Sequence, residues 1–297
     1  MNSATVGLRE RKTAFIEIFR TTPARTVCPN FYVLAHANGC SFTPQCSYCY
    51  LKSSFWFLDR CEAFTNGVKL IEEVRHWIAR DRLESYVLNA GNLSDSLAFE
   101  EIRPLMVHLI ETFRTEAGGR PHTLLLVTKG GKRECKSLFS VEPCENVIVS
   151  FSVNNSEAAY RHENGAAPVD ERLHAAAGLK KLGWRIRIRL DPMLLGYDYS
   201  RVLEDIRGLA PERVTLGTLR AERSLSRFTG NELFSELEPS QEKNSLARYP
   251  LAQRLRLYRQ AVGMLRDLCP IALCEEEEAV WDNLGLDKVG KQCNCCL

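Results

Sequence analysis

Three cysteines stand within one short segment, "NGCSFTPQCSYCYLK", which spans residues 38–52. Five residues separate Cys40 from Cys46, and two separate Cys46 from Cys49. Structural zinc normally takes four ligands from two separate knuckles. Three clustered thiolates without a nearby fourth are more typical of a 4Fe-4S cluster with one open iron. The spacing therefore favours an iron–sulfur enzyme, and a zinc-binding, non-catalytic module is the alternative.

A second group of cysteines closes the chain in "KQCNCCL", residues 291–297. Together with Cys274, its three thiols can complete a zinc site or a second iron–sulfur cluster. We predict Cys274, Cys293 and Cys295 as metal ligands. Adjacent cysteines do not easily face one cluster, so Cys295 and Cys296 are also candidates for a reactive catalytic thiol. A redox pair is a further role open to these thiols.

Bulk composition indicates an ordinary water-soluble protein. The chain has 297 residues, 45% of them hydrophobic, with a formal net charge of +2. Proteins that live by neutralising phosphates usually carry a larger positive excess, so nucleic acid is not a favoured partner. The sequence contains neither a signal peptide nor an apolar run long enough to span a membrane. We expect a cytoplasmic protein whose thiols stay reduced.

Six apolar runs rich in β-formers alternate with amphipathic stretches. The runs are "NFYVLAH", "SYVLNAGN", "HTLLLVTK", "NVIVSFSVN", "WRIRIRLDP" and "RVTLGTL". Helical spacing of apolar residues marks the stretches 62–80, 99–114, 170–182, 200–209 and 247–267. This alternation predicts a parallel α/β sheet, either a barrel or an open doubly wound fold. We place an N-terminal extension at 1–27, the main domain at 28–268 and a cysteine-rich tail at 269–297.

Polar residues follow five consecutive runs, for example "NAGNLSDS", "TKGGK" and "RLDPM". The carboxyl ends of parallel strands are where α/β enzymes gather their chemistry. The placement therefore predicts an enzyme. Two charge-rich stretches carry a weaker prediction: Arg254 and its neighbours, and the run Glu275 to Glu278, are expected on solvated helix surfaces.

The cysteine segment and the strand ends together resemble the radical S-adenosylmethionine (SAM) superfamily, and within it the spore photoproduct lyase family. The resemblance rests on "CSYCYLK", "NLSDSLAFE", "LLLVTK", "VIVSFSVN" and "HENGAAPVDERLHAAAGLKKLGWRIRIRLDPM", in this order, over residues 30–240. It implies an α/β fold, a partial (β/α)6 radical SAM barrel, followed here by a C-terminal cysteine-rich extension. The class of enzyme, lyase or transferase, stays open.

The resemblance also implies cofactors and partners. Cys40, Cys46 and Cys49 would bind three irons of a 4Fe-4S cluster, and the fourth iron would bind SAM. Reductive cleavage of SAM would generate a 5′-deoxyadenosyl or related radical, with an electron donor such as flavodoxin or ferredoxin. The substrate would be a small molecule, a nucleotide or a peptide.

Individual residues match the polar positions of the family. The implied SAM contacts are Gly91, Asn92, Lys129, Ser152 and Arg189. Tyr48 and Tyr50 match the tyrosines of a hydrogen relay and are the predicted catalytic aromatic residues.

The sequence departs from the family in three places. The cysteine spacing is five then two, where three then two is usual. Asn92 occupies the position of the hydrogen-donating cysteine of the repair lyase, and an amide cannot donate that hydrogen atom. The C-terminal cysteines have no counterpart in the repair enzyme. We therefore expect the radical to act on another substrate, with DNA photoproduct repair as the alternative function.

Overall fold

The fold was analysed in a computed structural model that describes residues 6–20, 23, 25–229, 232–239, 245–290 and 293–296. Its strands are β1 Gly7–Arg9, β2 Ile16–Phe19, β3 Thr26–Val27, β4 Phe31–Leu34, β5 Ala37–Asn38, β6 Glu62–Phe64, β7 Val87–Asn89, β8 Thr123–Thr128, β9 Val147–Val153, β10 Arg185–Met193, β11 Arg213–Thr218, β12 Arg220–Ala221, β13 Ala247–Arg248, β14 Ile271–Leu273 and β15 Glu276–Glu277. Its helices are α1 Leu51–Ser54, α2 Gly67–Ile78, α3 Met106–Glu116, α4 Lys136–Phe139, α5 Ser156–His162, α6 Val169–Lys181, α7 Ser200–Leu209, α8 Ser226–Thr229, the 3-10 helix η1 Glu232–Glu236, α9 Leu251–Leu265 and α10 Glu278–Leu284.

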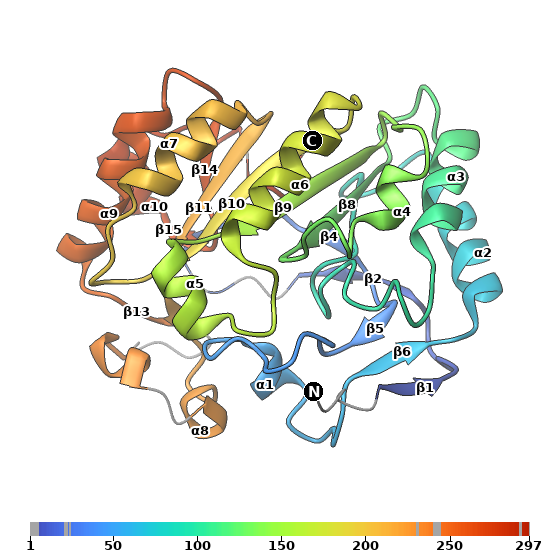
Figure 1. The fold of residues 1–297 in the computed structure, drawn as a ribbon, viewed down its shortest axis with the longest axis horizontal. Helices are drawn as coiled ribbons and strands as arrows, with labels where there is room; N and C mark the ends of the chain where they lie inside the picture. Colours follow the sequence, from blue (N-terminus) through green and yellow to red (C-terminus); the bar gives the residue numbers. More distant parts are fainter. Residues whose placement is uncertain are drawn as a thin grey trace.

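One eight-stranded sheet organises the chain, in the order β14-β11-β10-β9-β8-β7-β4-β2 (Figure 1). Neighbouring strands from β4 to β14 run parallel, and only β2 pairs antiparallel with β4. All six strands expected from the sequence are present in this sheet. The mixed α/β class is thereby confirmed.

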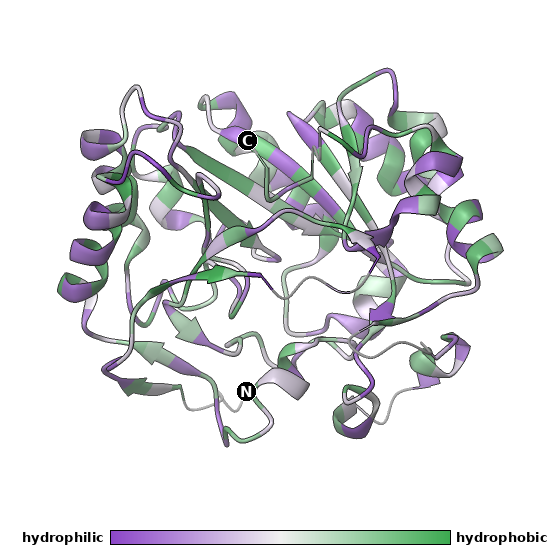
Figure 2. Cartoon of the chain, turned by 180° about the vertical axis from the view of Figure 1, so that it is seen from behind, coloured by the Kyte–Doolittle hydropathy of each residue, from purple (hydrophilic) through white to green (hydrophobic). Residues whose placement is uncertain are grey.

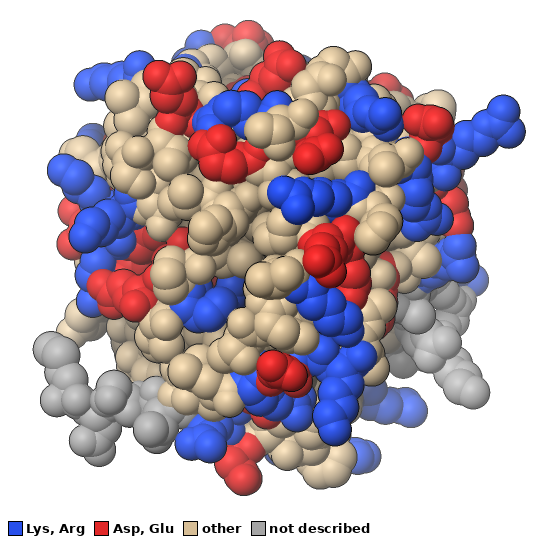
Figure 3. Space-filling model, turned by 90° about the vertical axis from the view of Figure 1, so that its right-hand side faces the viewer, with Lys and Arg blue, Asp and Glu red and all other residues tan. Residues whose placement is uncertain are grey.

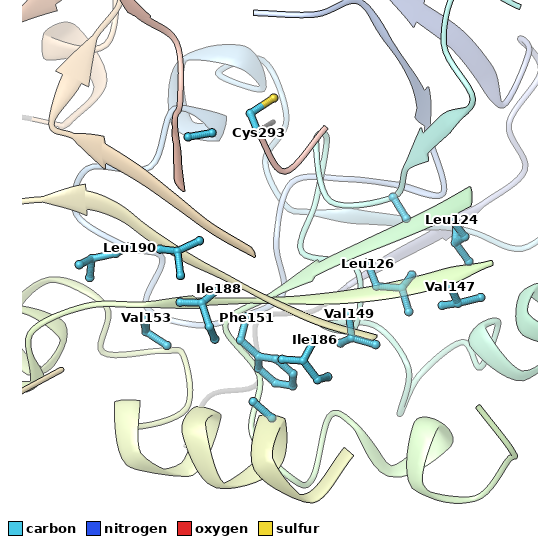
Figure 4. Packing of buried hydrophobic residues seen from close by; sticks show 14 of the residues in the cluster. Leu124, Leu126, Val147, Val149, Phe151, Val153, Ile186, Ile188, Leu190 and Cys293 are labelled. Carbon is cyan, nitrogen blue, oxygen red and sulfur yellow. The ribbon is translucent and has the colours of Figure 1, made fainter. Parts of the chain in front are cut away.

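The sheet has a face covered by helices and an opposite, inner face. Alternate residues Leu126, Val149, Phe151, Ile186 and Ile188 point from the strands toward the helices (Figure 4). Both faces are covered, and all seven residues of β9 are buried. Burial on both faces explains why these strands read as nearly continuous apolar runs rather than as alternating patterns.

The helix-covered face is packed by the amphipathic stretches that the sequence marks. Helices α2, α3, α6, α7 and α9 correspond to the five expected ones. Figure 2 shows hydrophobic strands in the interior, while the helices carry hydrophilic residues as well. The first helix begins at Gly67 rather than at residue 62, because Glu62–Phe64 forms β6 between β1 and β5.

The predicted domain boundaries at 27 and 269 stay a prediction, although strands on both sides of each one pair within the main sheet. Strand β2 lies in the supposed extension yet pairs with β4, and Ile271 of the supposed tail pairs with Val214 of β11. Strands of three or four residues give too short a pattern to be recognised from sequence alone. The main sheet therefore draws on residues 16–273, and the C-terminal cysteines follow α10.

Two charged groups expected on solvated helix surfaces are buried instead. Arg254 is 6% exposed, and its guanidinium bonds to Glu276, which is 1% exposed. The hydroxyl of Tyr258 donates to the same carboxylate at 2.8 Å. Glu276 and Glu277 form strand β15 against β3, and only Glu278 begins a helix. Each charge is compensated by the other, which is what permits both to be buried.

On the surface, charges of both signs are interspersed over the face that includes the α2 and α3 side of the molecule (Figure 3). Among the described residues, no helix combines the length and apolar character that crossing a membrane requires.

Candidate functional site

The three clustered cysteines lie on a loop between β5 and α1, here called the cysteine loop, residues 40–49. Gly39 enters it with a positive φ of 78° and donates its N–H to Leu93 O at 2.9 Å. Burial raises the pKa of the Cys40 thiol, and the charges of Asp95, Cys49 and Cys46 raise it further. The three thiols therefore lie within electrostatic reach of one another, and none forms a disulfide.

The donor chemistry of this loop fits an iron–sulfur cluster. Three thiols, the usual ligand type for such clusters, come from one short loop. Within the described part of the chain, no set of three or more His, Cys, Asp or Glu is gathered closely enough to hold a single metal ion. In a cubane cluster each thiolate binds a different iron, so its sulfurs need not converge on one point. The metal sets at Cys40, Cys46 and Cys49 and at Cys274, Cys293 and Cys295 stay predictions.

The cysteine loop is held from outside by the segment 162–165, "HENG". Ser47 donates its N–H to His162 O at 2.8 Å, and its hydroxyl lies 3.0 Å from the His162 ring nitrogen Nδ1. Gly165 packs so tightly that a Cβ there would stand 2.4 Å from Pro44 O and 2.5 Å from Thr43 N. Only glycine fits this contact without moving the loop backbone.

Beneath the loop lies a fully buried carboxylate, Glu163. It accepts hydrogen bonds from the Tyr48 hydroxyl, from Lys129 Nζ at 3.1 Å, from Arg172 Nη1 at 2.5 Å and from Asn154 Nδ2 at 3.1 Å. Burial alone would raise the pKa of Glu163, but the charges of Lys129 and Arg172 outweigh it and hold the pKa below its usual range. The carboxylate is therefore ionised and ties the loop to β8, β9 and α6.

The two predicted catalytic tyrosines have different surroundings. Tyr48 is buried, and its hydroxyl is committed to Glu163. Tyr50 is 44% exposed, and its hydroxyl donates to the backbone oxygen of Asn92. Tyr48 thus anchors the cysteine loop from below, whereas Tyr50 bridges the loop to the segment after β7 at the open side.

That segment, "GNLSDS", is fastened to the end of β8. A Cβ at Gly91 would stand 2.5 Å from Val127 Cβ, so the two strand ends approach more closely than another residue permits. Asp95 accepts bonds from Thr128 Oγ1 at 2.9 Å and from Lys129 N–H at 2.7 Å. The structure thus brings Gly91, Asn92 and Lys129 to one end of the sheet, as predicted.

Arg189 and Ser152 face each other across β9 and β10, where they are paired in register. Arg189 bonds to Asp191, and its Nη2 lies 3.2 Å from Cys274 Sγ. Arg220 approaches the same two partners, Asp191 Oδ1 at 2.7 Å and Cys274 Sγ at 3.1 Å. Cys274 therefore sits between two guanidinium groups at the end of β14.

Sequence reasoning did not single out Glu163, His162, Asp191 or Arg220. Glu163 and His162 lie in the block "HENGAAPVDERLHAAAGLKKLGWRIRIRLDPM" of the resemblance, and Asp191 lies near the carboxyl end of β10, so a signal for each was present. Their contacts bridge up to 115 positions in sequence, and no local pattern reveals such partners.

The C-terminal cysteines lie against the inner face of the sheet. The four residues Cys293–Cys296, here called the C-terminal turn, lie on the inner face. Arg187 donates to Asn294 O at 2.9 Å and to Cys296 O at 2.7 Å, and Arg213 donates to Cys293 O at 2.9 Å. Arg213 is the first residue of β11 and Arg187 the third of β10. A catalytic role for Cys295 and Cys296 stays a prediction.

Comparison with known proteins places residues 8–229 in a match to the family model described as spore photoproduct lyase. The curated spore photoproduct lyase of Clostridium acetobutylicum is 20% identical over 220 residues, which are 74% of this chain and 63% of that protein. The one of Bacillus subtilis is 22% identical over 187 residues, 62% of this chain and 53% of that protein. The matches thus span less than two thirds of either curated relative.

Solved structures show the same fold. A spore photoproduct lyase complexed with dinucleoside spore photoproduct superposes with a TM-score of 0.69 at 15% identity, over 91% of this chain and 81% of the other. SuiB of Streptococcus suis, bound to S-adenosylmethionine, gives a TM-score of 0.52 at 10% identity, over 84% of this chain and 52% of the other. At these identities the likeness concerns the fold.

Proposed function

Because this chain belongs to the spore photoproduct lyase family, we propose that it is a radical SAM enzyme whose cluster is bound by Cys40, Cys46 and Cys49. The eight-stranded sheet would then be the partial (β/α)6 barrel of that superfamily, with the C-terminal turn as its appended extension. The observation that carries the proposal is the cysteine loop itself. Three free thiols on one short loop are held near the carboxyl ends of the strands by a buried network around Glu163.

The residues around the loop have separate tasks in this proposal. The close contact of Gly91 with Val127 keeps the backbone next to the loop free of side chains where SAM would lie. Ser152 and Arg189, which are paired in register on β9 and β10, would present polar groups to SAM from the inner face of the sheet. Bound there, a 4Fe-4S cluster and SAM would supply one-electron cleavage of a carbon–sulfur bond, which generates a carbon radical.

For Lys129 we propose a support role in addition to the SAM contact, which stays a prediction. Its ammonium lies 3.1 Å from Glu163 and 3.4 Å from the Tyr48 hydroxyl. Through these two contacts, Lys129 would help to hold Tyr48 and Glu163, and with them the cysteine loop, in place. Tyr50, whose hydroxyl reaches Asn92 O, is the tyrosine placed to face a substrate radical.

We propose a small molecule, a nucleotide or a peptide as the substrate, and a flavodoxin or ferredoxin as the electron donor. Asn92 occupies the position of the hydrogen-donating cysteine of the repair lyase. An amide cannot donate a hydrogen atom to a carbon radical, which argues against direct repair of DNA photoproducts. Repair is the second candidate because both curated relatives are named for it.

Anaerobic reconstitution with iron and sulfide tests the proposal. We expect about four irons per chain, the visible absorption of an iron–sulfur cluster, and formation of 5′-deoxyadenosine on addition of dithionite and SAM. Cys46→Ala should lose the cluster, whereas the matched variant Cys269→Ser should keep it. A loaded cluster that leaves SAM intact would refute the proposal. Turnover of irradiated DNA by the same preparation would favour the repair function instead.

A further inference from the structure

The C-terminal turn brings two thiols into contact. Cys296 donates its N–H to Cys293 O at 3.1 Å, which closes a four-residue β-turn. The two Sγ atoms lie 3.5 Å apart. A β-turn keeps the Cα atoms of its first and fourth residues within about 7 Å. That separation reaches the range that a disulfide needs, so the bond requires only a small movement of the two sulfurs.

The turn is held by its backbone rather than by its cysteines. Arg187 and Arg213 together bind the carbonyl oxygens of Cys293, Asn294 and Cys296. Arg187 is 1% exposed, so its hydrogen bonds to the turn are protected from water. These bonds fix the turn on the inner face through its backbone and do not involve the sulfurs of Cys293 and Cys296.

Cys295, between the two, is turned into different surroundings. Its Sγ lies 3.9 Å from Asn89 Nδ2. It packs against the small apolar cluster of Val87, Leu125 and Ile148 on the inner face. The turn therefore contains one thiol that packs like a small apolar side chain and two that face each other.

We propose that Cys293 and Cys296 are a redox-active dithiol that forms a reversible disulfide by exchange with a low-molecular-weight disulfide. Cys293 is buried and Cys296 is partly exposed, so Cys296 meets the incoming disulfide first. Its thiolate attacks one sulfur and expels the first small thiolate. Cys293 then attacks the mixed disulfide and expels the second. The two protons of the protein thiols end on the two departing thiols, and two electrons leave the protein.

This pair gives the chain a two-electron centre on the inner face of the sheet, separate from the cysteine loop. Figure 4 shows Cys293 across the sheet from the residues that face helix α6. The inference needs neither a cluster nor SAM, so it stands or falls separately from the proposed function. Because Cys293 is also a predicted metal ligand, a bound metal is the rival occupant and must be an outcome of the test.

A peptide map tests the pairing in the full-length chain. The protein is incubated with oxidised or with reduced glutathione, denatured, alkylated and cut with trypsin. Cleavage after Lys291 releases residues 292–297, whose only cysteines are the three in question. We expect the oxidised sample to lack two hydrogen atoms in this peptide and to carry a single alkyl group, on Cys295. Reduced glutathione should restore three alkylated cysteines.

Variants separate the two partners from their neighbour. Cys293→Ser and Cys296→Ser should each lose the internal disulfide completely, whereas Cys295→Ser should retain it with an unchanged glutathione midpoint. Circular dichroism on each variant confirms that it is folded, and the map of the unmodified chain is decisive without them. Three alkylated cysteines after oxidation, a cross-link to Cys28 or Cys274, or release of a stoichiometric metal would each overturn the proposal.

Discussion

The two cysteine groups of this chain are held on one sheet in different ways. In the cysteine loop, the residues between the thiols do the anchoring: Ser47 bonds to His162, and Tyr48 bonds to Glu163. In the C-terminal turn, the backbone of the cysteines themselves is bound, by Arg187 and Arg213. The loop keeps its thiols separate, whereas the turn brings two of them into contact.

This difference has a physical consequence for what each group can bind. Anchoring through neighbouring residues leaves the three thiols of the loop free of disulfides. In the C-terminal turn, the bound carbonyl oxygens belong to a β-turn, which brings the sulfurs of Cys293 and Cys296 into contact. The supports also differ in charge, because Glu163 is an ion paired with two cations, while the tail offers the arginines only neutral carbonyls.

Removing the charge of Glu163 should have the largest effect on stability. Glu163→Gln leaves Arg172 and Lys129 without a buried counter-charge. Breaking a buried ion pair in this way typically costs about 3–5 kcal/mol. We expect a loss of that size in the free energy of unfolding, measured with denaturant, and poorer iron retention after reconstitution.

Glu157→Gln is the matched control, on helix α5, which ends one residue before Glu163. Glu157 pairs with Arg161 at the surface, and both side chains are 60% exposed. Such a pair contributes about 0.5 kcal/mol or less. Because the pKa of Glu163 is depressed in the folded chain, its contribution should be complete above the unfolded value of about 4.3 and decline as the pH falls below it. Equal effects of both variants at pH 7 would show that Glu163 is not the anchor of the loop.

Removing hydrogen bonds to the C-terminal turn should cause the next largest loss in the free energy of unfolding. Arg187→Met removes two charge-assisted bonds to carbonyl oxygens and one ion pair with Glu212. We expect a loss of about 2–3 kcal/mol in unfolding free energy. The rate of alkylation of Cys293 in the folded chain should rise at the same time.

Arg185→Met, two residues earlier on β10, is the comparison for that variant. Arg185 also pairs with Glu212 but is 36% exposed and does not bond to the turn. Its removal should cost less than about 1 kcal/mol and leave the reactivity of Cys293 unchanged. Faster alkylation in both variants would mean that the turn is not held by Arg187.

The sequence was sufficient for features that are local. Strands β8 and β9 are buried on both faces, so their apolar runs are unbroken and could be recognised without partners. The cysteine loop was recognisable because its three thiols lie within ten residues. The same locality placed Gly91 and Lys129 correctly at strand ends.

The sequence was insufficient where a residue is defined by a distant partner. Arg187 alternates with apolar residues as a solvent-facing strand residue would, yet the far C-terminal turn covers it. Arg254 has the spacing of a solvated helix face, but Glu276 and Tyr258 enclose it. Strand β14 is three residues long and gains its identity only by pairing with β11. Each of these contacts depends on tertiary structure, which periodicity does not encode.

Gly165→Ala tests the steric part of the loop's support and should have a smaller effect. The added methyl would overlap the backbone at Thr43 and Pro44, and overpacking of this kind typically costs about 1–3 kcal/mol. Since the overlap is with the cysteine loop, iron content after reconstitution should fall along with stability. Gly263→Ala in α9 is the control, because nothing lies within 4 Å of its added methyl. That variant should be stabilised by about 0.5–1 kcal/mol with its iron content unchanged.

Protonation of His36 in acid should lower the free energy of unfolding. This is the smallest effect that we predict. His36 is buried, with Nε2 3.0 Å from Ala90 O and Nδ1 2.9 Å from Arg103 Nη2. Burial first, and then the charge of Arg103, lowers the pKa of His36 to about 3. The unfolded chain takes up this proton near pH 6.5, so stability is complete above that pH and declines as the pH falls toward 3.

The decline should approach about 1.4 kcal/mol per pH unit at most. Measured between pH 7 and 5, the slope of unfolding free energy should be shallower in His36→Gln than in the unmodified chain. His76→Gln, at an exposed position on α2, should keep the full slope. Hydrogen exchange at pH 5 should quicken around Ala90 and the cysteine loop while the C-terminal turn stays protected. If both cysteine groups loosened together, the sheet would respond to acid as one unit, and the contrast between them would be confined to their chemistry.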